Sequence, residues 1–184
     1  MRARGLHSVV SNAAGFTLVE LLVGVTIVSI LAAIAVPGFR GVVQNNRIRS
    51  VSESMQNGMS MARAEAVRLN TQVEFVLLPT GWVVRKVTDP NNPLHQATGR
   101  ENRTGLKVTP VPGGADRITY NSFGLAPTLN PSDGSVRMLR LDIEVDTPAN
   151  TNSYKPLRIQ LLGSGMPRLC DPNAASTEPK ACLP

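Results

Sequence analysis

The chain has 184 residues, of which 42% are hydrophobic, 17% are charged and 4% are aromatic. This length suits one domain with an accessory segment, and the mean hydropathy of −0.03 excludes a protein with several membrane spans. Two cysteines and two histidines are too few for a zinc module rich in these residues. The net charge of +6 permits contact with DNA or an anionic membrane but establishes neither.

The first part of the chain combines a basic start with a long apolar run. Residues 1–15 contain Arg2 and Arg4 and no acidic residue, and no charged residue lies between Leu21 and Val36. At a rise of ~1.5 Å per residue, an apolar helix over residues 16–36 is long enough to cross a bilayer once. The sequence therefore predicts a single membrane helix.

Glu20 is the exception within this helix. An ionisable side chain in a membrane segment costs on the order of a few kcal/mol and normally has a partner. No lysine or arginine lies between Arg4 and Arg40, so the partner has to come from elsewhere. A chain cut after Gly15 would expose an α-amine on Phe16, and the amine of a neighbouring subunit could then pair with Glu20.

The sequence Gly15-Phe16-Thr17-Leu18-Val19-Glu20-Leu21-Leu22, followed by an apolar stretch and Pro37, resembles the type IV pilin-like family. The resemblance implies that residues 1–15 are a leader that stays in the cytoplasm. It implies that a prepilin peptidase cuts after Gly15 and methylates Phe16, which makes Glu20 the fifth residue of the mature chain. The implied location is the bacterial inner membrane, with a single pass, a periplasmic domain and assembly into a pilus or pseudopilus.

Two other interpretations of this segment remain open. Ala33-Ile34-Ala35 resembles a signal-peptidase site, and cleavage there would release a soluble protein. The segment could also be a plain signal anchor. Glu20 argues against a cleaved signal peptide, because this charged residue would lie inside the apolar region of the signal.

A second helical stretch is predicted over residues 38–70, after a kink at Pro37, where proline removes a backbone donor. Apolar residues recur there at steps of three and four, which is typical of one buried helix face. Asn70 is expected to end the helix, and Gly58 indicates close packing at one point. The stripe consists of Ile48, Val51, Met55, Met59, Ala62, Ala66 and Leu69.

Residues 61–68 read Met-Ala-Arg-Ala-Glu-Ala-Val-Arg and resemble the signature of the FimT/GspH branch of the pilin-like family. The implied fold class is α+β: a type IV pilin fold whose long N-terminal helix packs on an antiparallel β-sheet domain. On this basis residues 16–37 form the transmembrane and filament-core half of the helix. Residues 38–70 form its amphipathic half, and residues 71–184 form a periplasmic β-rich domain with a disulfide-closed tail.

From Thr71 onward the apolar pattern changes to that of strands. Residues 72–78 and 82–87 flank Pro79-Thr80-Gly81 and predict a hairpin. Residues 88–103 are polar and proline-containing, so they are expected to form a loop that holds a solvated His95. Further strands are predicted at Leu106–Val111, Arg117–Asn121, Val136–Val145 and Leu157–Leu162.

The only two cysteines, Cys170 and Cys182, lie in the C-terminal tail. Their even number, their position and the expected export favour a disulfide, which would stabilise the fold by ~3 kcal/mol in the chain-entropy model. The alternative is two free thiols. The disulfide is thus an expectation that depends on an oxidising compartment.

Some members of the FimT side of the branch bind DNA through a Gly-Arg-x-Arg-like element before the first cysteine. Here Gly165 and Arg168 match this element, whereas Met166 replaces the first arginine. Arg158, Arg168 and Lys180 are the candidate DNA contacts, although residues 131–184 carry no net charge.

The preferred function is a minor pilin of a type IV pilus, a structural or assembly-priming subunit in the filament or at its tip. Its expected partners are other major and minor pilins, the prepilin peptidase and the inner membrane, with DNA as a further candidate. The alternatives are a pseudopilin H-like subunit of type II secretion, a DNA-binding pilin of natural transformation and a membrane-anchored enzyme. No phosphate-binding glycine loop, paired-carboxylate signature or metal-spaced His/Cys set is apparent, so no catalytic residue, cofactor or metal site is assigned.

Overall fold

The computed structural model describes residues 15–98, 104–146 and 154–183, with only the backbone given for residues 35–40. The contacts between residues divide the chain into two compact units, Met1–Arg40 and Gly41–Pro184. One helix, α1 (Leu18–Arg68), contributes to both units. It runs without interruption through Pro37, and the kink predicted at this residue stays a prediction.

The carboxyl end of α1 is closed by a left-handed residue, as expected for Asn70. Asn70 has a φ of 48°, a conformation that asparagine tolerates better than most residues. The N–H of Thr71 donates to the carbonyl of Ala66 at 3.1 Å, and the N–H of Asn70 donates to that of Val67 at 3.3 Å. Two terminal carbonyls of the helix are thereby satisfied, and the chain turns into the first strand.

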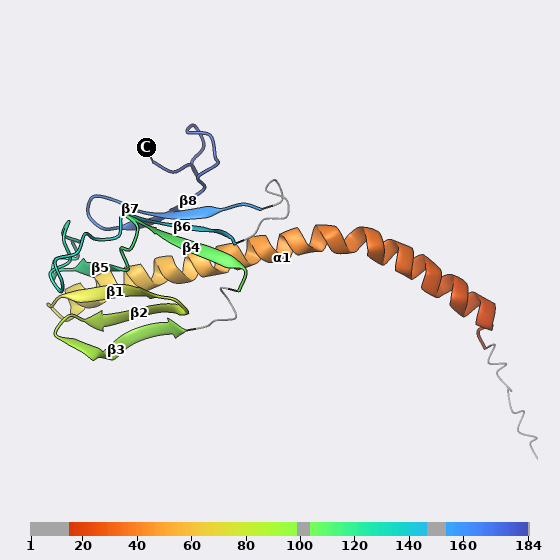
Figure 1. Cartoon of the computed structure of the whole chain (residues 1–184), viewed down its shortest axis with the longest axis horizontal. Helices are drawn as coiled ribbons and strands as arrows, with labels where there is room; N and C mark the ends of the chain where they lie inside the picture. Colours follow the sequence, from red (N-terminus) through yellow and green to blue (C-terminus); the bar gives the residue numbers. More distant parts are fainter. Residues whose placement is uncertain (1–14, 99–103, 147–153, 184) are drawn as a thin grey trace, which may run out of the picture. The chain divides into compact units, whose positions relative to one another are not determined.

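The domain contains two antiparallel four-stranded sheets that lie over the second half of α1 (Figure 1). The first sheet has the order β3-β2-β1-β5, and the second has the order β4-β6-β7-β8. In the first sheet the strands are β1 (Val73–Leu78), β2 (Gly81–Lys86), β3 (Asp89–Thr98) and β5 (Arg117–Tyr120). In the second they are β4 (Leu106–Val111), β6 (Arg140–Val145), β7 (Leu157–Leu161) and β8 (Pro167–Cys170).

The core forms where the predicted stripe of α1 meets both sheets. Six of its seven residues are buried, and only Leu69 is half-exposed. The first sheet adds Phe75, Trp82, Val84, Ile118 and Tyr120, and the second sheet adds Leu141, Ile143 and Ile159. The prediction of an amphipathic helix on a β-rich domain is therefore confirmed.

Gly58 explains how α1 approaches the first sheet so closely. A Cβ atom at this position would lie 2.9 Å from ring atoms of both Phe75 and Trp82. These two rings contact each other, with centroids 5.8 Å apart, and the indole Nε1 of Trp82 donates to the Ser54 hydroxyl at 3.1 Å. The missing side chain of Gly58 leaves the space that both rings fill.

The loop predicted over residues 88–103 is wrong for residues 89–98, which form the edge strand β3. This strand carries Pro90 and Pro93, and proline is tolerated in a strand that lies at the edge of a sheet, as β3 does among the described strands. His95 lies on β3, with its Nε2 3.2 Å from Glu65 Oε1 of α1. It is therefore not a simple solvated loop residue.

Two further differences concern the second sheet. The strand predicted from Val136 begins only at Arg140, because the preceding residues bridge the two sheets. The N–H of Met138 donates to Arg117 of β5, and the N–H of Leu139 donates to Val111 of β4. The four-residue strand β8 was not predicted at all.

Candidate functional site

The predicted processing site lies immediately before α1. Gly15 and Phe16 precede the helix, and Phe16 is 85% exposed. The rest of the predicted leader, residues 1–14, lies outside the described residues. The peptide bond between Gly15 and Phe16 is therefore accessible and lies just before the start of α1.

Thr17 and Glu20 together form the amino end of α1. The backbone N–H of Glu20 donates to the Thr17 hydroxyl oxygen at 3.2 Å, which is the N-cap contact of a Thr-x-x-Glu capping box. The acidic side chain of Glu20 lies in the first turn, where the helix dipole favours a negative charge by ~0.3–1 kcal/mol. This capping of the helix was not predicted from the sequence, although the Thr-x-x-Glu spacing of Thr17 and Glu20 could have indicated it.

The first half of α1 exposes apolar side chains on all its faces. Between Leu18 and Ile34, every large apolar side chain is 52% to 74% exposed. The hydroxyls of Thr26 and Ser29 donate to the helix carbonyls of Val23 and Val25 at 2.8 and 2.7 Å, so these polar groups need no outside partner. A helix that is apolar all round requires burial outside its own chain.

Among the described residues, the structure contains no helix with the length and apolar character required to cross a membrane. The side chains of residues 35–37, the last part of the predicted segment 16–37, lie outside the description.

The predicted disulfide is present at the carboxyl end of the domain. Cys170 on β8 is bonded to Cys182, with a Cα–Cα distance of 5.0 Å. The backbone N–H of Asp171 also donates to the Lys180 carbonyl at 2.8 Å. These contacts close the intervening residues into a loop, so the alternative of two free thiols is wrong.

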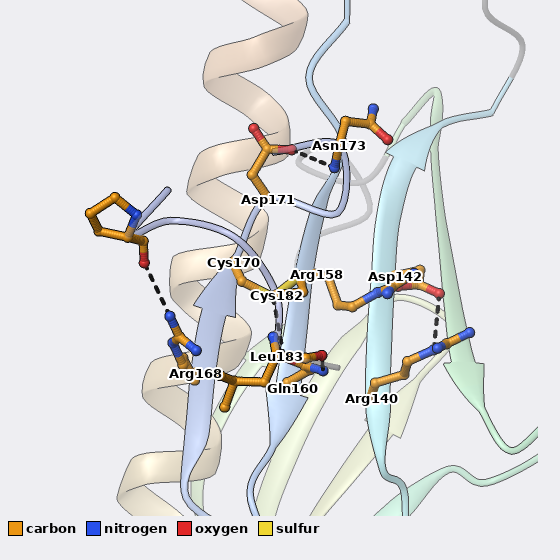
Figure 2. Close-up of a disulfide and its surroundings, with 11 residues drawn as sticks. Arg140, Asp142, Arg158, Gln160, Arg168, Cys170, Asp171, Asn173, Cys182 and Leu183 are labelled. Carbon is orange, nitrogen blue, oxygen red and sulfur yellow. Dashed lines mark hydrogen bonds and ion pairs between the residues drawn. A yellow bond between two sulfur atoms is a disulfide. The ribbon is translucent and has the colours of Figure 1, made fainter. Parts of the chain in front are cut away.

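Gln160 on β7 holds the last described residues of the tail (Figure 2). Its Nε2 donates to the Leu183 carbonyl at 2.8 Å, and its Oε1 accepts from the Leu183 N–H at 2.9 Å. One side-chain amide therefore satisfies both backbone groups of Leu183. Together with the disulfide, this contact fixes the tail against the outer face of the second sheet.

The three candidate DNA contacts point to different partners. Arg158 forms an ion pair with Asp142 of β6, whereas Arg168 turns the other way and donates to the Pro179 carbonyl at 3.1 Å (Figure 2). Lys180 Nζ lies 3.1 Å from Glu178 Oε2. Arg158 and Lys180 therefore each pair with a carboxylate, and Arg168 is hydrogen-bonded to the tail.

Gly165, which matched the DNA-binding element, has a clear packing function. Its φ is 83°, and a Cβ atom there would lie 2.4 Å from the Cβ of Ala126. Its carbonyl accepts a 2.8 Å hydrogen bond from the buried hydroxyl of Tyr120. Because these contacts alone require glycine, the match at Gly165 is not specific for DNA binding.

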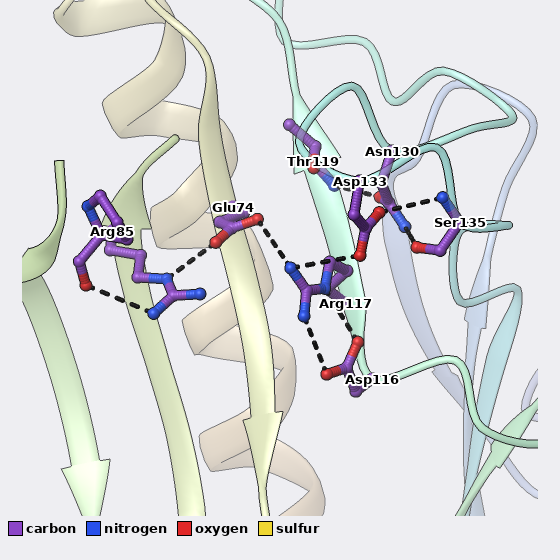
Figure 3. A network of polar contacts seen from close by, with 9 residues as sticks. Glu74, Arg85, Asp116, Arg117, Thr119, Asn130, Asp133 and Ser135 are labelled. Atoms are coloured by element: carbon purple, nitrogen blue, oxygen red, sulfur yellow. Dashed lines mark hydrogen bonds and ion pairs between the residues drawn. The ribbon is translucent and has the colours of Figure 1, made fainter. Parts of the chain in front are cut away.

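An ionic network around the buried Glu74 lies on the first sheet (Figure 3). Glu74 is 2% exposed and accepts from Arg85 Nε at 2.7 Å, while its other oxygen lies 3.8 Å from Arg117. Arg117 also pairs with Asp116 at 2.9 Å and with Asp133 at 3.3 Å. The hydrogen bond that Arg117 donates to Asp116 raises the pKa of Arg117, and the hydrogen bonds that Asp133 accepts from Ser135 lower the pKa of Asp133.

This network joins β1, β2 and β5 to the connection after β5. Asn130 in that connection accepts from the Thr119 N–H at 3.0 Å and donates to the Ser135 hydroxyl at 3.0 Å. The partly exposed Arg85 and Arg117 compensate the charge of the buried Glu74. Their arrangement supports a structural function of the network, which the sequence pattern did not indicate.

Comparison with known proteins gives two family matches and a structural one. The model of the prokaryotic N-terminal methylation motif matches residues 10–36, and the model of type II transport protein GspH matches residues 51–165. Two crystal forms of the Pseudomonas aeruginosa type IV minor pilin FimU share the fold, each with a TM-score of 0.51. One is 15% identical, and the match covers 77% of this chain and 99% of the crystallised one. The other is 14% identical, with 70% and 97% covered.

Proposed function

The chain belongs to the GspH family of pilin-like proteins, and on this premise we propose that it is a minor pilin of a type IV pilus. The subunit enters the filament, or occupies its tip, as a structural or assembly-priming component. The observation that carries the proposal is Glu20, a carboxylate four residues after Phe16 at the start of an otherwise apolar, exposed helix segment.

The assembly step follows from the charges at the amino end. Cleavage after Gly15 by a prepilin peptidase gives Phe16 a positively charged amine, which stays charged after methylation. In a filament of parallel stems, this amine lies near Glu20 of a neighbouring subunit and neutralises it. Burial of the apolar side chains supplies the driving force, whereas the ion pair sets the register between stems.

Before assembly, the same apolar segment anchors the subunit in the inner membrane. The match of residues 10–36 to the methylation motif supports a membrane-anchored subunit. The globular domain then lies in the periplasm, where an oxidising environment allows the bond between Cys170 and Cys182.

A pseudopilin of a type II secretion system is the second candidate. It is favoured by the match over residues 51–165 to a family described as a type II transport protein. The pilus is favoured by the fold shared with a type IV minor pilin and by the disulfide-closed tail. Purification of each type of filament from the native cell, followed by mass spectrometry for this chain, separates the two candidates.

The contacts favour a structural function over DNA binding for the predicted basic residues. DNA affinity depends mainly on clustered cations that are free to neutralise phosphates. Arg158 and Lys180 already face carboxylates, and Arg168 is bonded to the tail. DNA binding is therefore the weaker proposal for this face.

Replacement of Glu20 tests the function directly. We expect Glu20→Ala to lower recovery of the subunit in purified filaments by about 10-fold or more, because the amine of the neighbour loses its buried partner. Glu20→Gln should lower it similarly, since the amide lacks the charge. Leader removal, measured by N-terminal sequencing that starts at methylated Phe16, should be retained.

Two variants control for other causes. Glu53→Ala removes an acid that forms an exposed ion pair with Arg49 elsewhere on α1 and should leave recovery unchanged. Thr17→Ala removes the N-cap oxygen while keeping the Glu20 charge. A Thr17→Ala defect as large as that of Glu20→Ala, or normal recovery of Glu20→Ala, would contradict the proposal.

A further inference from the structure

An apolar groove of about 530 Å³ runs beside the last turns of α1. One wall is the helix, and the others are the turn after β5 and the turn before β8. Its lining includes Arg63, Ala64, Val67, Arg68, Phe123 and Met166. The lining includes neither cysteine of the disulfide and no residue of the first half of α1.

Backbone contacts hold the first turn in place. The Asn121 side chain accepts from the N–H groups of Phe123 and Leu125, both at 3.0 Å. Arg63 Nε donates to the Gly124 carbonyl at 2.8 Å and ties the turn to the helix. A Cβ atom on Gly124 would lie 3.1 Å from Val67 Cγ2, so the turn packs directly on α1.

The second turn is fixed by similar contacts. The N–H of Leu162 donates to the Met166 carbonyl at 3.0 Å, and Tyr120 bonds to Gly165 beside it. The groove therefore exists before any partner binds, and little ordering is required of it on binding.

Large apolar side chains stay exposed around this ordered groove. Phe123 is 80% exposed, Val67 is 53% exposed and Met166 is 43% exposed. Exposed apolar surface that is gathered around a groove marks an interaction site more often than isolated side chains do. Aromatic residues, methionine and arginine are also the types enriched in protein interfaces.

We propose that this groove binds the globular domain of a different pilin subunit, through an apolar side chain of that subunit flanked by a carboxylate. The groove lining contains two arginines and no acidic residue. Arg68 pairs with Glu65, whereas Arg63 forms no ion pair with any carboxylate in the described part of the chain. An acidic group beside the apolar side chain would compensate this charge.

Charge also explains why the occupant is not a second copy of this chain. Filaments grow through head-to-tail interfaces, in which one end of a domain meets the opposite end of the next. The opposite end of this domain begins with helix residues 41–53, where Arg49 pairs with Glu53 at 2.8 Å, whereas the exposed Arg47 forms no ion pair with any carboxylate in the described part of the chain. Each end thus keeps one arginine without an ion pair, Arg63 at the groove and Arg47 at the opposite end. Because these like charges repel each other, the groove is better suited to an unlike subunit than to a second copy.

This inference rests on the proposed function, and its test uses the full chain in cells that assemble the filament. A photoreactive phenylalanine analogue at position 123 should cross-link to one other protein, identified by mass spectrometry as a different pilin with its own methylation motif. The same analogue at Leu129, an exposed apolar residue (52% exposed) outside the groove lining, should not.

A matched pair of charge variants tests the chemistry of the partner. Val67→Glu should lower the cross-link yield from position 123 by about 10-fold, whereas Val67→Lys should lower it by less than about 3-fold. Unchanged Trp82 fluorescence on urea unfolding shows that both variants fold. Equal effects of the two variants, a cross-link to a second copy or to a protein without a pilin stem, or no cross-link would overturn the proposal.

Failure of this inference is separable from failure of the proposed function. If Glu20→Ala prevents filament entry while the groove variants behave like the wild type, only the groove proposal fails. If Glu20→Ala enters the filament normally, the proposed function itself fails.

Discussion

The two halves of α1 contain similar apolar residues but differ in what covers them. In the first half, residues such as Leu22 and Val25 are 56% and 57% exposed. In the second half, Ile48 and Met59 are 0% exposed because both sheets pack on them. The same helix therefore provides a core element at one end and an uncovered apolar surface at the other.

This difference separates folding from assembly. The second half has polar residues on its solvent face, which is the pattern of a helix that packs on its own domain. The first half has apolar residues on every face, and the domain does not need them for its core. Residues that stabilise the domain and residues that drive assembly can therefore be changed independently.

The largest expected effect comes from a buried residue of the second half. Met59→Ala should lower the free energy of unfolding by ~2–5 kcal/mol, because a cavity replaces a fully buried side chain. Leu22→Ala, its counterpart in the first half, should change it by less than ~0.5 kcal/mol. Urea unfolding of the full chain in detergent, followed by the fluorescence of the single tryptophan Trp82, measures both.

Recovery of the subunit in purified filaments should show the opposite order, with Leu22→Ala having the larger effect and Met59→Ala the smaller one. Leu22→Ala removes apolar surface from the stem and should lower recovery in filaments without altering the domain. If Leu22→Ala destabilises the domain as much as Met59→Ala does, the separation of the two halves is wrong.

A pair of glycines gives a smaller but sharper contrast. Gly58→Ala should lower the free energy of unfolding by ~1–3 kcal/mol, since the new methyl group would lie 2.9 Å from the Phe75 and Trp82 rings. Gly24→Ala meets no atom within 4 Å and should raise helix stability by up to ~1 kcal/mol. Urea unfolding monitored by tryptophan fluorescence checks the first, and thermal melting monitored by helical circular dichroism checks the second.

The outcome decides whether close packing or helix propensity dominates at each position. A Gly58→Ala protein that is more stable than the wild type would mean that the two rings move aside at little cost.

The sequence predicted those parts of the fold that rest on local pattern. The stripe from Ile48 to Ala66 recurs at helical spacing, and Pro79-Thr80 between two apolar runs marks the hairpin of β1 and β2. The amino-terminal motif was also recognisable, because the order of its residues is specific. Each of these features is visible within a short window of the chain.

The parts that could not be predicted depend on contacts between distant residues. Strand β3 is polar and contains two prolines, and its pairing follows from the position of β2 beside it. Strand β8 has four residues and is held by pairing with β7 and by the disulfide. Residues 136–139 have a strand-like pattern, yet their hydrogen bonds go to both sheets.

The candidate site was predicted unevenly for the same reason. The pairing of Cys170 with Cys182 followed from there being only two cysteines in the tail. The partners of Arg158 and Arg168 were not predictable, because Asp142 and Pro179 reach them only through the sheet and the closed tail. Glu74 lies on a strand that is buried on both faces, so its alternation gave no sign of the ionic network.

The smallest expected effect is a pH response confined to the domain. Burial raises the pKa of Tyr120 well above its usual range, whereas an unfolded tyrosine titrates near ~10. Above this pH the unfolded chain loses a proton that the folded chain keeps, so stability falls as the pH rises. Between pH 9 and pH 11 this effect amounts to roughly 1.4 kcal/mol for one group.

Tyr120→Phe separates this contribution from that of other alkaline groups. At pH 8 the variant should be less stable by ~0.5–1.5 kcal/mol, because it lacks the hydrogen bond to Gly165. The difference between wild type and variant should shrink by roughly 1.4 kcal/mol by pH 11, since phenylalanine does not titrate. Urea unfolding at a series of pH values measures it, and a difference that stays constant would show that the Tyr120 hydroxyl ionises as readily in the folded domain as in the unfolded chain.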